Sequence, residues 1–495
     1  MRLCVALCQQ QWNRKAGADM TTQYETVIGL EVHVELATRT KIFCGCSTQF
    51  GAPANANTCP VCTGMPGTLP VLNRQVVEYA LALGLSMSCK VNQYCCFDRK
   101  NYFYPDNPQN YQISQLYLPI CHDGEVEIET AKGKKLIRIH EMHMEEDAGK
   151  LMHDESNDTS LVDYNRSGVP LLEIVSEPDF CSAQEVIAYL EKLKMLCQYL
   201  GISDCKLQEG SMRADVNLSV RPVGSDVLGT RTEMKNLASF KAITKAIEVE
   251  SRRQIALLEV GETVVQETRR WDENKEQSFT MRSKEDAKDY RYFPDPDLQP
   301  IMISDDWLAR VESEKPEFQP QKQLRFQEQY KLSAYDAALL TQSRHMAELY
   351  EQTVALSGNP KKTANWFMGE CMRLLKEKGM DAEQLKFTPK HLAALIIALD
   401  KGEINQEIAK TVFERIFEDD IEPLAYMKEH NLLMISDTGA IEAAVDEVLI
   451  ENTKVVEEYR SGKEKVLGFL VGQVMKKTKG KASPGMVTEL LKAKL

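Results

Sequence analysis

The segment Tyr24–Leu36 reads Tyr-Glu-Thr-Val-Ile-Gly-Leu-Glu-Val-His-Val-Glu-Leu, and from residue 28 onward its apolar and polar residues alternate strictly. This period of two predicts a half-buried β-strand, because successive side chains of a strand point to opposite faces. One face packs against a core, and the other presents Glu31, His33 and Glu35. A solvated outer face is the simpler explanation for an isolated strand, so a functional interpretation depends on other polar groups that converge with these.

The length of 495 residues exceeds what one hydrophobic core serves, so we expect two or three domains. No apolar run approaches the roughly 18 residues of a membrane span, and we expect a cytoplasmic protein that engages no membrane. Residues 1–23 form an expected disordered or mis-started lead. Its first 19 residues show no clear periodicity, and Met20 stands just before the first strand pattern.

A second alternating segment, residues 211–221, also predicts a strand with a polar face. This face carries Arg213, Asp215 and Asn217, which are candidate substrate-binding groups.

Glu173 stands inside the apolar run 169–175, which predicts a buried strand. A buried charge is costly unless a partner compensates it, and an arginine or a metal ion are the two candidates. The segment 140–149 adds an unusual density of His, Glu and Asp. Its histidines are three residues apart, so it does not carry the His-Glu-x-x-His zinc motif.

Two closely spaced cysteine pairs follow the first strand pattern: Cys44 with Cys46, and Cys59 with Cys62. In a reducing compartment this pattern predicts a structural zinc site, because four thiolates close a tetrahedral shell and leave no position for water. Disulfide bonds are the alternative, which suits a cytoplasmic protein less well.

Basic and aromatic residues are mixed in the segment 98–115, where Lys100 could meet a phosphate group as a point charge. A packed surface loop is the alternative interpretation. From about residue 315 helical periodicity replaces the strand patterns, as in the segment 388–402 with Thr388 as its cap. The predicted fold class is therefore α+β, with a β-rich N-terminal part and all-helical C-terminal parts.

The net charge of −13 argues against a surface coated by nucleic acid, but it leaves room for a local basic patch. Residues 463–495 hold eight lysines and two glutamates, a local charge of +6. A solvated helix face would look similar. The candidate nucleic-acid contacts are Lys476, Lys477, Lys479 and Lys481.

Four long motifs occur in one order along the chain: Glu31-Val-His33-Val-Glu, Lys100-Asn-Tyr-Phe-Tyr-Pro-Asp-Asn-Pro, His143-Met-Glu-Glu-Asp-Ala-Gly-Lys150 and Tyr290-Arg-Tyr-Phe-Pro-Asp-Pro-Asp. Together they resemble the B subunit of bacterial glutamyl/aspartyl-tRNA amidotransferase, in the GatB/GatE family, from about Tyr24 to the C-terminus. The resemblance implies a β-rich cradle that acts as a kinase over residues 24–314, with the zinc insert. It also implies a helical linker over 315–350 and a YqeY-like tail domain that binds tRNA over 351–495.

The resemblance also implies functional residues. The family's catalytic Mg²⁺ ligands match Glu31, His33, Glu146 and Glu173, and its ATP-adjacent positions match Lys100 and Phe240. The residue pattern alone does not choose Glu146 over Glu145, nor does it find Phe240. His33 fits less well than the acids, because Mg²⁺ prefers oxygen ligands.

The implied reaction is amidation of mischarged Glu-tRNA(Gln), Asp-tRNA(Asn) or both, after ATP phosphorylates the side-chain carboxylate. The chain has neither a Gly-x-x-x-x-Gly-Lys-Ser/Thr loop nor an amidase Ser-Ser-Lys signature. Glutamine hydrolysis should therefore occur in a partner, and the resemblance names an amidase A subunit and a small C subunit. Two alternatives remain at this point: a non-enzymatic, zinc-stapled tRNA adaptor, and an ATP-dependent ligase that acts on a free acid.

Overall fold

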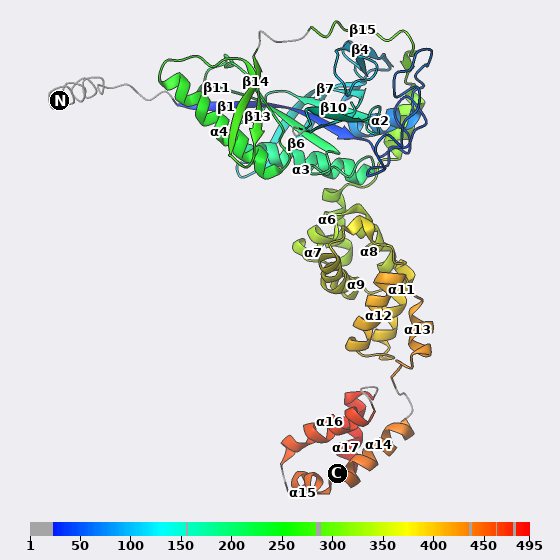
Figure 1. Ribbon diagram of the computed structural model, residues 1–495. Helices are drawn as coiled ribbons and strands as arrows, with labels where there is room; N and C mark the ends of the chain where they lie inside the picture. Colours follow the sequence, from blue (N-terminus) through cyan, green and yellow to red (C-terminus); the bar gives the residue numbers. More distant parts are fainter. Residues whose placement is uncertain (1–22, 155–156, 284–288, 435–437, 462, 479–481) are drawn as a thin grey trace, which may run out of the picture. The chain divides into compact units, whose positions relative to one another are not determined.

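The computed structural model describes residues 23–154, 157–283, 289–434, 438–461, 463–478 and 482–495 (Figure 1). The chain divides into two compact units between Pro316 and Glu317. The predicted lead lies outside the described residues except for residue 23, and so do Lys479 and Lys481.

A nine-stranded sheet forms the centre of the first unit, in the order β14-β13-β12-β11-β1-β10-β7-β6-β2. All neighbouring strands are antiparallel except β12 and β13. The first alternating segment is the central strand β1 (Tyr24–Glu35), and the second is its neighbour β11 (Met212–Pro222). The other strands are β2 (Lys90–Val91), β6 (Cys121–Thr130), β7 (Gly133–Glu146), β10 (Pro170–Ser176), β12 (Thr232–Lys235), β13 (Glu267–Asp272) and β14 (Gln277–Ser283).

One face of this sheet is apolar and packs against three helices. Ile28, Leu30, Val32 and Val34 of β1 are at most 1% exposed on this face. Helix α2 contacts β7, α3 contacts β6, and α4 contacts β11, so the alternation of β1 separates a core face from a polar face (Figure 1). These helices are α2 (Arg74–Ser86), α3 (Ala183–Leu200) and α4 (Phe240–Glu259).

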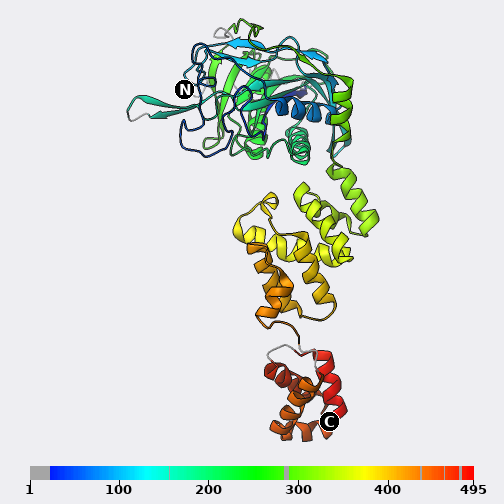
Figure 2. The ribbon, with the colours of Figure 1, turned by 90° about the vertical axis from the view of Figure 1, so that its right-hand side faces the viewer.

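Smaller elements complete the first unit. A three-stranded sheet β15-β4-β5 contacts β7 through β5. A hairpin of β8 and β9 projects from the first unit (Figure 2). Strands β3 and β16 pair, and helix α5 contacts α2. The bounds are β3 (Tyr94–Cys95), β4 (Asp98–Asn101), β5 (Tyr111–Ser114), β8 (Lys150–Asp154), β9 (Thr159–Asp163), β15 (Phe293–Pro294), β16 (Ile301–Met302) and α5 (Asp305–Ser313).

The described part of the second unit is helical and holds two separate hydrophobic cores. The first core runs from Phe326 to Met427, and the second runs from Ile441 to Leu491. Residue 350, where we expect a domain boundary, lies inside α8 and contributes to the first core. The helices are α6 (Gln319–Tyr330), α7 (Ala334–Leu340), α8 (Arg344–Ser357), α9 (Pro360–Trp366), the π-helical turn η2 (Phe367–Cys371), α10 (Met372–Lys378), η3 (Ala382–Gln384), α11 (Pro389–Asp400), α12 (Gln406–Asp419), α13 (Pro423–Glu429), α14 (Thr438–Glu451), α15 (Thr453–Arg460), η4 (Glu464–Val466), α16 (Leu467–Lys477) and α17 (Pro484–Lys494).

The predicted α+β class is confirmed by this arrangement of a mixed sheet followed by helices. Among the described residues, no helix combines the length and the apolar character that crossing a bilayer requires.

Candidate active site

A row of ionisable side chains crosses the polar face of the sheet. His33 on β1 pairs with Glu173 on β10, and Glu173 pairs with His143 on β7. Opposed residues of antiparallel strands lie on the same face, so the register itself brings these groups together. We call the following five residues the carboxylate cluster: Glu31, His33, His143, Glu145 and Glu173.

The distances within the carboxylate cluster are short. The Nε2 atom of His33 lies 3.3 Å from Oε1 of Glu145, 3.5 Å from Oε2 of Glu173 and 3.9 Å from Oε1 of Glu31. The Nε2 atom of His143 lies 2.7 Å from Oε2 of Glu173. Two sets of three potential ligand atoms each fall within 4.8 Å of one another. They are Glu31, His33 and Glu173, and His143, Glu145 and Glu173.

Electrostatic repulsion is evident at one edge of the carboxylate cluster. Burial, together with the nearby charge of Glu173, raises the pKa of Glu31 to about 7. The positive groups of His33 and Lys235 oppose this rise and do not cancel it. The surrounding protein therefore does not fully compensate the ionised form of Glu31, and a bound cation would stabilise that form.

The two imidazoles respond in the opposite direction. Burial by itself would lower the pKa of His143, yet Glu173 and Glu145 raise it to about 9. The same acids raise the pKa of His33 well above its ordinary value despite burial. Burial also opposes ionisation of Glu173, but His143 and His33 hold its pKa well below the usual range. Without a metal ion, His143 is thus an imidazolium and its partner Glu173 is a carboxylate.

The chemistry of this donor set fits a divalent cation. Three carboxylates supply oxygen atoms, which Mg²⁺ prefers, and each imidazole can supply a nitrogen after it loses a proton. The Nδ1 atom of His143 is buried and has no hydrogen-bond partner among the described residues.

Glu145 and Glu146 point to different places. Residues alternate along β7, so Glu145 shares its face with His143, whereas Glu146 does not. Oε1 of Glu146 accepts hydrogen bonds from the Ile113 backbone at 2.9 Å and from Nε2 of Gln109 at 3.1 Å. Burial raises the pKa of Glu146 to about 8. The structure therefore brings Glu145 to the carboxylate cluster, and it does not bring the carboxylate of Glu146 there.

Lys100 stands beside the carboxylate cluster on β4. Burial by itself would lower its pKa, yet Glu145, Tyr292 and Glu173 raise it. Its Nζ atom lies 5.2 Å from the ring centre of Tyr290, and no ion pair within 4.0 Å holds it among the described residues. Lys100 is thus a cation without an ion pair among the described residues, near the two acids Glu145 and Glu173, a position suited to a phosphate group. Phe240, the other position matched to ATP, is the first residue of α4 and supplies no atom to the carboxylate cluster.

The three substrate candidates of β11 flank β1 in register. Arg213 pairs with His33, Asp215 with Glu31, and Asn217 with Gly29. Asp215 forms an ion pair with Lys235, the last residue of β12.

Arg213 takes part in a second polar group on this face. Its guanidinium lies 2.8 Å from Oδ2 of Asp147, and Arg166 lies 3.4 Å from the same atom. Burial and Asp147 together raise the pKa of Glu35 to about 8.

The four predicted zinc ligands converge. The sulfur atoms of Cys44, Cys46, Cys59 and Cys62 all lie within 4.8 Å of one another. Sγ of Cys62 is 3.9 Å from that of Cys59 and 4.0 Å from that of Cys46. A tetrahedral zinc ion with Zn–S bonds of about 2.3 Å places its sulfurs about 3.8 Å apart, so the four thiols fit zinc.

A buried lysine supports this cysteine site. Lys41 is 0% exposed, and its Nζ donates to Sγ of Cys62 at 3.4 Å and to the Tyr164 carbonyl at 3.0 Å. A hydrogen bond from Cys44 and the charge of Lys41 lower the pKa of Cys62 to about 4, against the effect of burial. Lys41 thus provides a positive charge beside a site that would be strongly negative with four thiolates.

In the basic segment 463–495, some lysines pair with acids of the same domain and are less available for nucleic-acid contacts. Lys477 lies 2.7 Å from both Glu447 and Glu451, whereas Lys476 has no ion pair among the described residues. Lys479 and Lys481 lie outside those residues, so their role stays a prediction.

Two known protein families match the chain in separate segments. Residues 26–309 match the GatB/GatE catalytic domain family, which covers the sheet, the carboxylate cluster and the cysteine site. Residues 348–495 match the GatB domain family. This pair of matches defines the class, a GatB-type catalytic domain followed by a GatB helical domain.

Relatives specify the class further. The chain is 64% identical to the aspartyl/glutamyl-tRNA(Asn/Gln) amidotransferase B subunit of Agathobacter rectalis over 468 residues, 94% of this chain and 98% of the relative. It is 60% identical to the protein of the same name from Lachnoclostridium phytofermentans over 469 residues, 95% of this chain and 98% of the relative. The chain therefore belongs to the family of tRNA-dependent amidotransferase B subunits.

Proposed function

We propose that the first unit uses ATP to activate the side-chain carboxylate of a mischarged Glu-tRNA(Gln) or Asp-tRNA(Asn), so that ammonia can convert it into an amide. One observation carries this proposal. Three acids and two imidazoles from three adjacent strands meet at one point of the sheet beside the free cation of Lys100.

The reaction needs activation because a carboxylate has no good leaving group. Its oxygen attacks the γ-phosphorus of ATP, the bond to the β-phosphate oxygen breaks, and ADP leaves. The resulting acyl phosphate is attacked by ammonia, which forms the C–N bond, expels inorganic phosphate and releases a proton. Such phosphoryl transfer requires mainly positioning and neutralisation of charge from the protein.

We assign these tasks to particular side chains. Glu31, His33, Glu145 and Glu173 would hold a Mg²⁺ ion, which neutralises phosphate charge when bound. Lys100 would contact a phosphate oxygen, because its ammonium group has no competing ion pair among the described residues. The family resemblance assigns Glu146 instead of Glu145 as a ligand of Mg²⁺. Glu146 lines the same small cavity as Cys44 and Cys62, so we propose that it belongs to the cysteine site.

The proposed reaction needs a source of ammonia and a bound tRNA, and both involve partner molecules. We propose that an amidase A subunit supplies the ammonia and that a small C subunit completes the complex. The tail, with Lys476 and its neighbours, would contact tRNA through its phosphates. The four cysteines would hold a structural zinc ion.

The direct test is to incubate the assembled complex with Glu-tRNA(Gln) and with Asp-tRNA(Asn), each with and without ATP. We expect an amidated aminoacyl-tRNA only when ATP is present, with equal amounts of ADP and amide formed. Amide formation at the same rate without ATP would contradict carboxylate activation by phosphoryl transfer. The comparison of the two tRNAs also decides which amide this protein makes.

A further inference from the structure

The strand that carries Lys100 has little backbone support of its own. β4 has four residues and lies between β5, which also has four, and β15, which has two (Figure 1). A pairing of two residues supplies few hydrogen bonds between the strands. The location of Lys100 therefore depends on the side chains that tie β4 to its neighbours.

Arg99, the residue before Lys100, ties β4 to both neighbouring segments. Its Nε atom lies 2.6 Å from Oδ2 of Asp295, and its Nη2 atom lies 2.6 Å from Oδ2 of Asp297, just after β15. Its guanidinium carbon also lies 4.1 Å from the ring centre of Tyr111 on β5. A planar guanidinium fork fixes the orientation of its partners more narrowly than a point charge does. We call Arg99, Asp295 and Asp297 the Arg99 clamp.

The Arg99 clamp is buried and braced by further hydrogen bonds. The side chain of Asp295 is 0% exposed, and that of Arg99 is 16% exposed. Oδ1 of Asp295 accepts hydrogen bonds from the backbone nitrogens of Asp297 and Leu298 at 2.7 and 3.1 Å. The backbone nitrogen of Asp295 donates to the Phe97 carbonyl at 2.8 Å. A buried polar network with satisfied groups is rigid, so the clamp holds β4 firmly.

Asn101, the residue after Lys100, provides a second anchor to the segment that leads into β15. Its backbone nitrogen donates to the Tyr290 carbonyl at 2.9 Å, and its Nδ2 atom donates to the Arg291 carbonyl at 2.8 Å. Arg291 has a φ of +44°, in the left-handed region that residues other than glycine seldom adopt. The Asp289 carboxylate accepts a hydrogen bond from the Arg291 backbone nitrogen at 2.9 Å. These bonds hold Tyr290 at a fixed place beside β4.

Lys100 lies between the two anchors, and its side chain points the other way. Successive residues of a strand alternate, so Lys100 faces away from Arg99 and Asn101. Its Nζ atom lies 5.2 Å from the ring centre of Tyr290 and forms no ion pair in the part of the chain that the structure describes. A lysine has a flexible four-carbon stem, so its ammonium group needs other support to keep one place. The anchors give that support by fixing the strand beneath it and the ring beside it.

We infer that the Arg99 clamp positions the Lys100 ammonium group for the reaction, with Arg99, Asp295 and Asp297 as positioning residues. The inference depends on the proposed function, in which Lys100 contacts a phosphate oxygen of ATP. Without the clamp, β4 and the Tyr290 ring lose their common support, and the ammonium group moves away from the phosphate. A clamp that only stabilised the fold would not determine where this ammonium group lies.

The position of Lys100 is tested first in the full chain, without any need for catalysis. With lysines labelled by ¹³C at Cε, the NMR signal of Lys100 is the one that disappears in Lys100→Arg. We expect its protons upfield of those of the other lysines, because an aromatic ring shields groups above its face. Arg99→Met keeps an apolar stem and removes the fork, so it should move this signal toward the other lysines.

Two further variants keep this test decisive. Asp297→Ala removes the more exposed acid of the clamp and should cause a smaller shift in the same direction, even if Arg99→Met does not fold. Arg138→Met breaks an arginine–aspartate pair elsewhere, on β7, and should leave the Lys100 signal unchanged. An unchanged Lys100 signal in a folded Arg99→Met, or in Asp297→Ala if Arg99→Met does not fold, would overturn the inference.

The assembled complex then tests whether this position matters for the reaction. Arg99→Met should lower kcat/KM for ATP at least about tenfold, and Arg138→Met should leave it unchanged. If the clamp acts through Lys100, adding Arg99→Met to Lys100→Met should cause almost no further loss. Losses that multiply in the double variant would overturn the inference. If the wild-type complex forms no amide, the proposed function fails, but the NMR signal still decides whether the clamp positions Lys100.

Discussion

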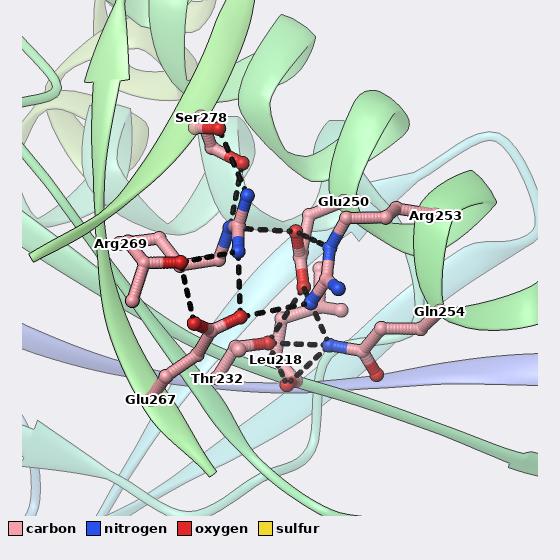
Figure 3. Close-up of polar contacts among 9 residues, drawn as sticks. Leu218, Thr232, Glu250, Arg253, Gln254, Glu267, Arg269 and Ser278 are labelled. Atoms are coloured by element: carbon pink, nitrogen blue, oxygen red, sulfur yellow. Dashed lines mark hydrogen bonds and ion pairs between the residues drawn. The ribbon is translucent and has the colours of Figure 1, made fainter. Parts of the chain in front are cut away.

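Two groups of buried charges in the first unit differ in how their charges are balanced. The Glu250 network consists of Thr232, Glu250, Arg253, Gln254, Glu267 and Arg269, and it joins α4 to β12 and β13 (Figure 3). Figure 3 shows the carboxylate of Glu250 between two guanidinium groups. Arg253 donates to both of its oxygens, at 2.7 and 2.9 Å, and Thr232 donates at 2.8 Å.

The opposite pKa shifts of Glu250 and Glu31 reflect this difference in charge balance. Burial by itself would raise the pKa of Glu250, but hydrogen bonds from Arg253, Gln254 and Thr232 hold it below its ordinary value. In the carboxylate cluster, burial and Glu173 raise the pKa of Glu31 to about 7. Matched charges thus fix a helix on a sheet, whereas an excess of acids leaves a site that gains from a cation.

The largest effect should come from breaking the matched network. Glu250→Ala removes the buried carboxylate that binds Arg253, Thr232 and Gln254 and leaves Glu267 alone to compensate Arg253 and Arg269, so we expect a loss of about 3 to 5 kcal/mol in the free energy of unfolding. Urea unfolding of the full chain measures this loss. Glu248→Ala, which removes a half-exposed acid from the same helix, should cost less than about 1 kcal/mol. Equal losses in the two variants would show that the Glu250 network is not a stabilising feature.

Removing an acidic charge from the carboxylate cluster should have the opposite effect and raise the free energy of unfolding. The folded pKa of Glu31 lies above its ordinary value of 4.5, so the folded protein holds the proton more tightly and loses stability as pH rises from about 5 to 7. Glu31→Gln removes this loss, and the metal-free variant should be more stable than wild type at pH 8 by about 1 to 3 kcal/mol. Unfolding in EDTA at pH 5 and pH 8 checks this.

The same variant should lose amidation activity in the assembled complex. A stable but inactive Glu31→Gln protein would sharpen the contrast with Glu250→Ala. A destabilised Glu31→Gln variant at pH 8 would instead place Glu31 among the matched charges.

A smaller effect is expected at the cysteine site. Lys41 places one buried cation against the sulfur of Cys62, which makes this site resemble the matched network. Lys41→Met keeps the length of the side chain and removes its charge, so zinc affinity should fall about 10- to 100-fold. Competition with a chromophoric chelator measures this affinity, with Lys134→Met as an exposed control. Unchanged zinc affinity would show that the buried charge does not support the metal.

The sequence predicts much of the fold, because alternation is a local signal. The strands β1 and β11, the buried strand around Glu173 and the cysteine cluster all occur where their patterns indicate. The helical second unit was predictable for the same reason. Local patterns do not specify which strands become neighbours, so the meeting of His33 with Glu173 and His143 required the register of three strands.

The choice between Glu145 and Glu146 illustrates this limit. The sequence does contain a usable signal, since Glu145 shares the parity of His143 along one strand. It becomes informative only after β7 is known to run to residue 146.

The most direct measurement is the affinity of Mn²⁺, a paramagnetic probe for Mg²⁺, for the full chain by electron paramagnetic resonance. Glu145→Gln should weaken Mn²⁺ binding at least about tenfold, because it removes a carboxylate that lies 3.3 Å from His33. Glu146→Gln should change it by less than about twofold, because the Glu146 carboxyl has a pKa of about 8 and already bonds to Ile113. Loss of Mn²⁺ binding in Glu146→Gln, with full binding in Glu145→Gln, would contradict the proposed cation site.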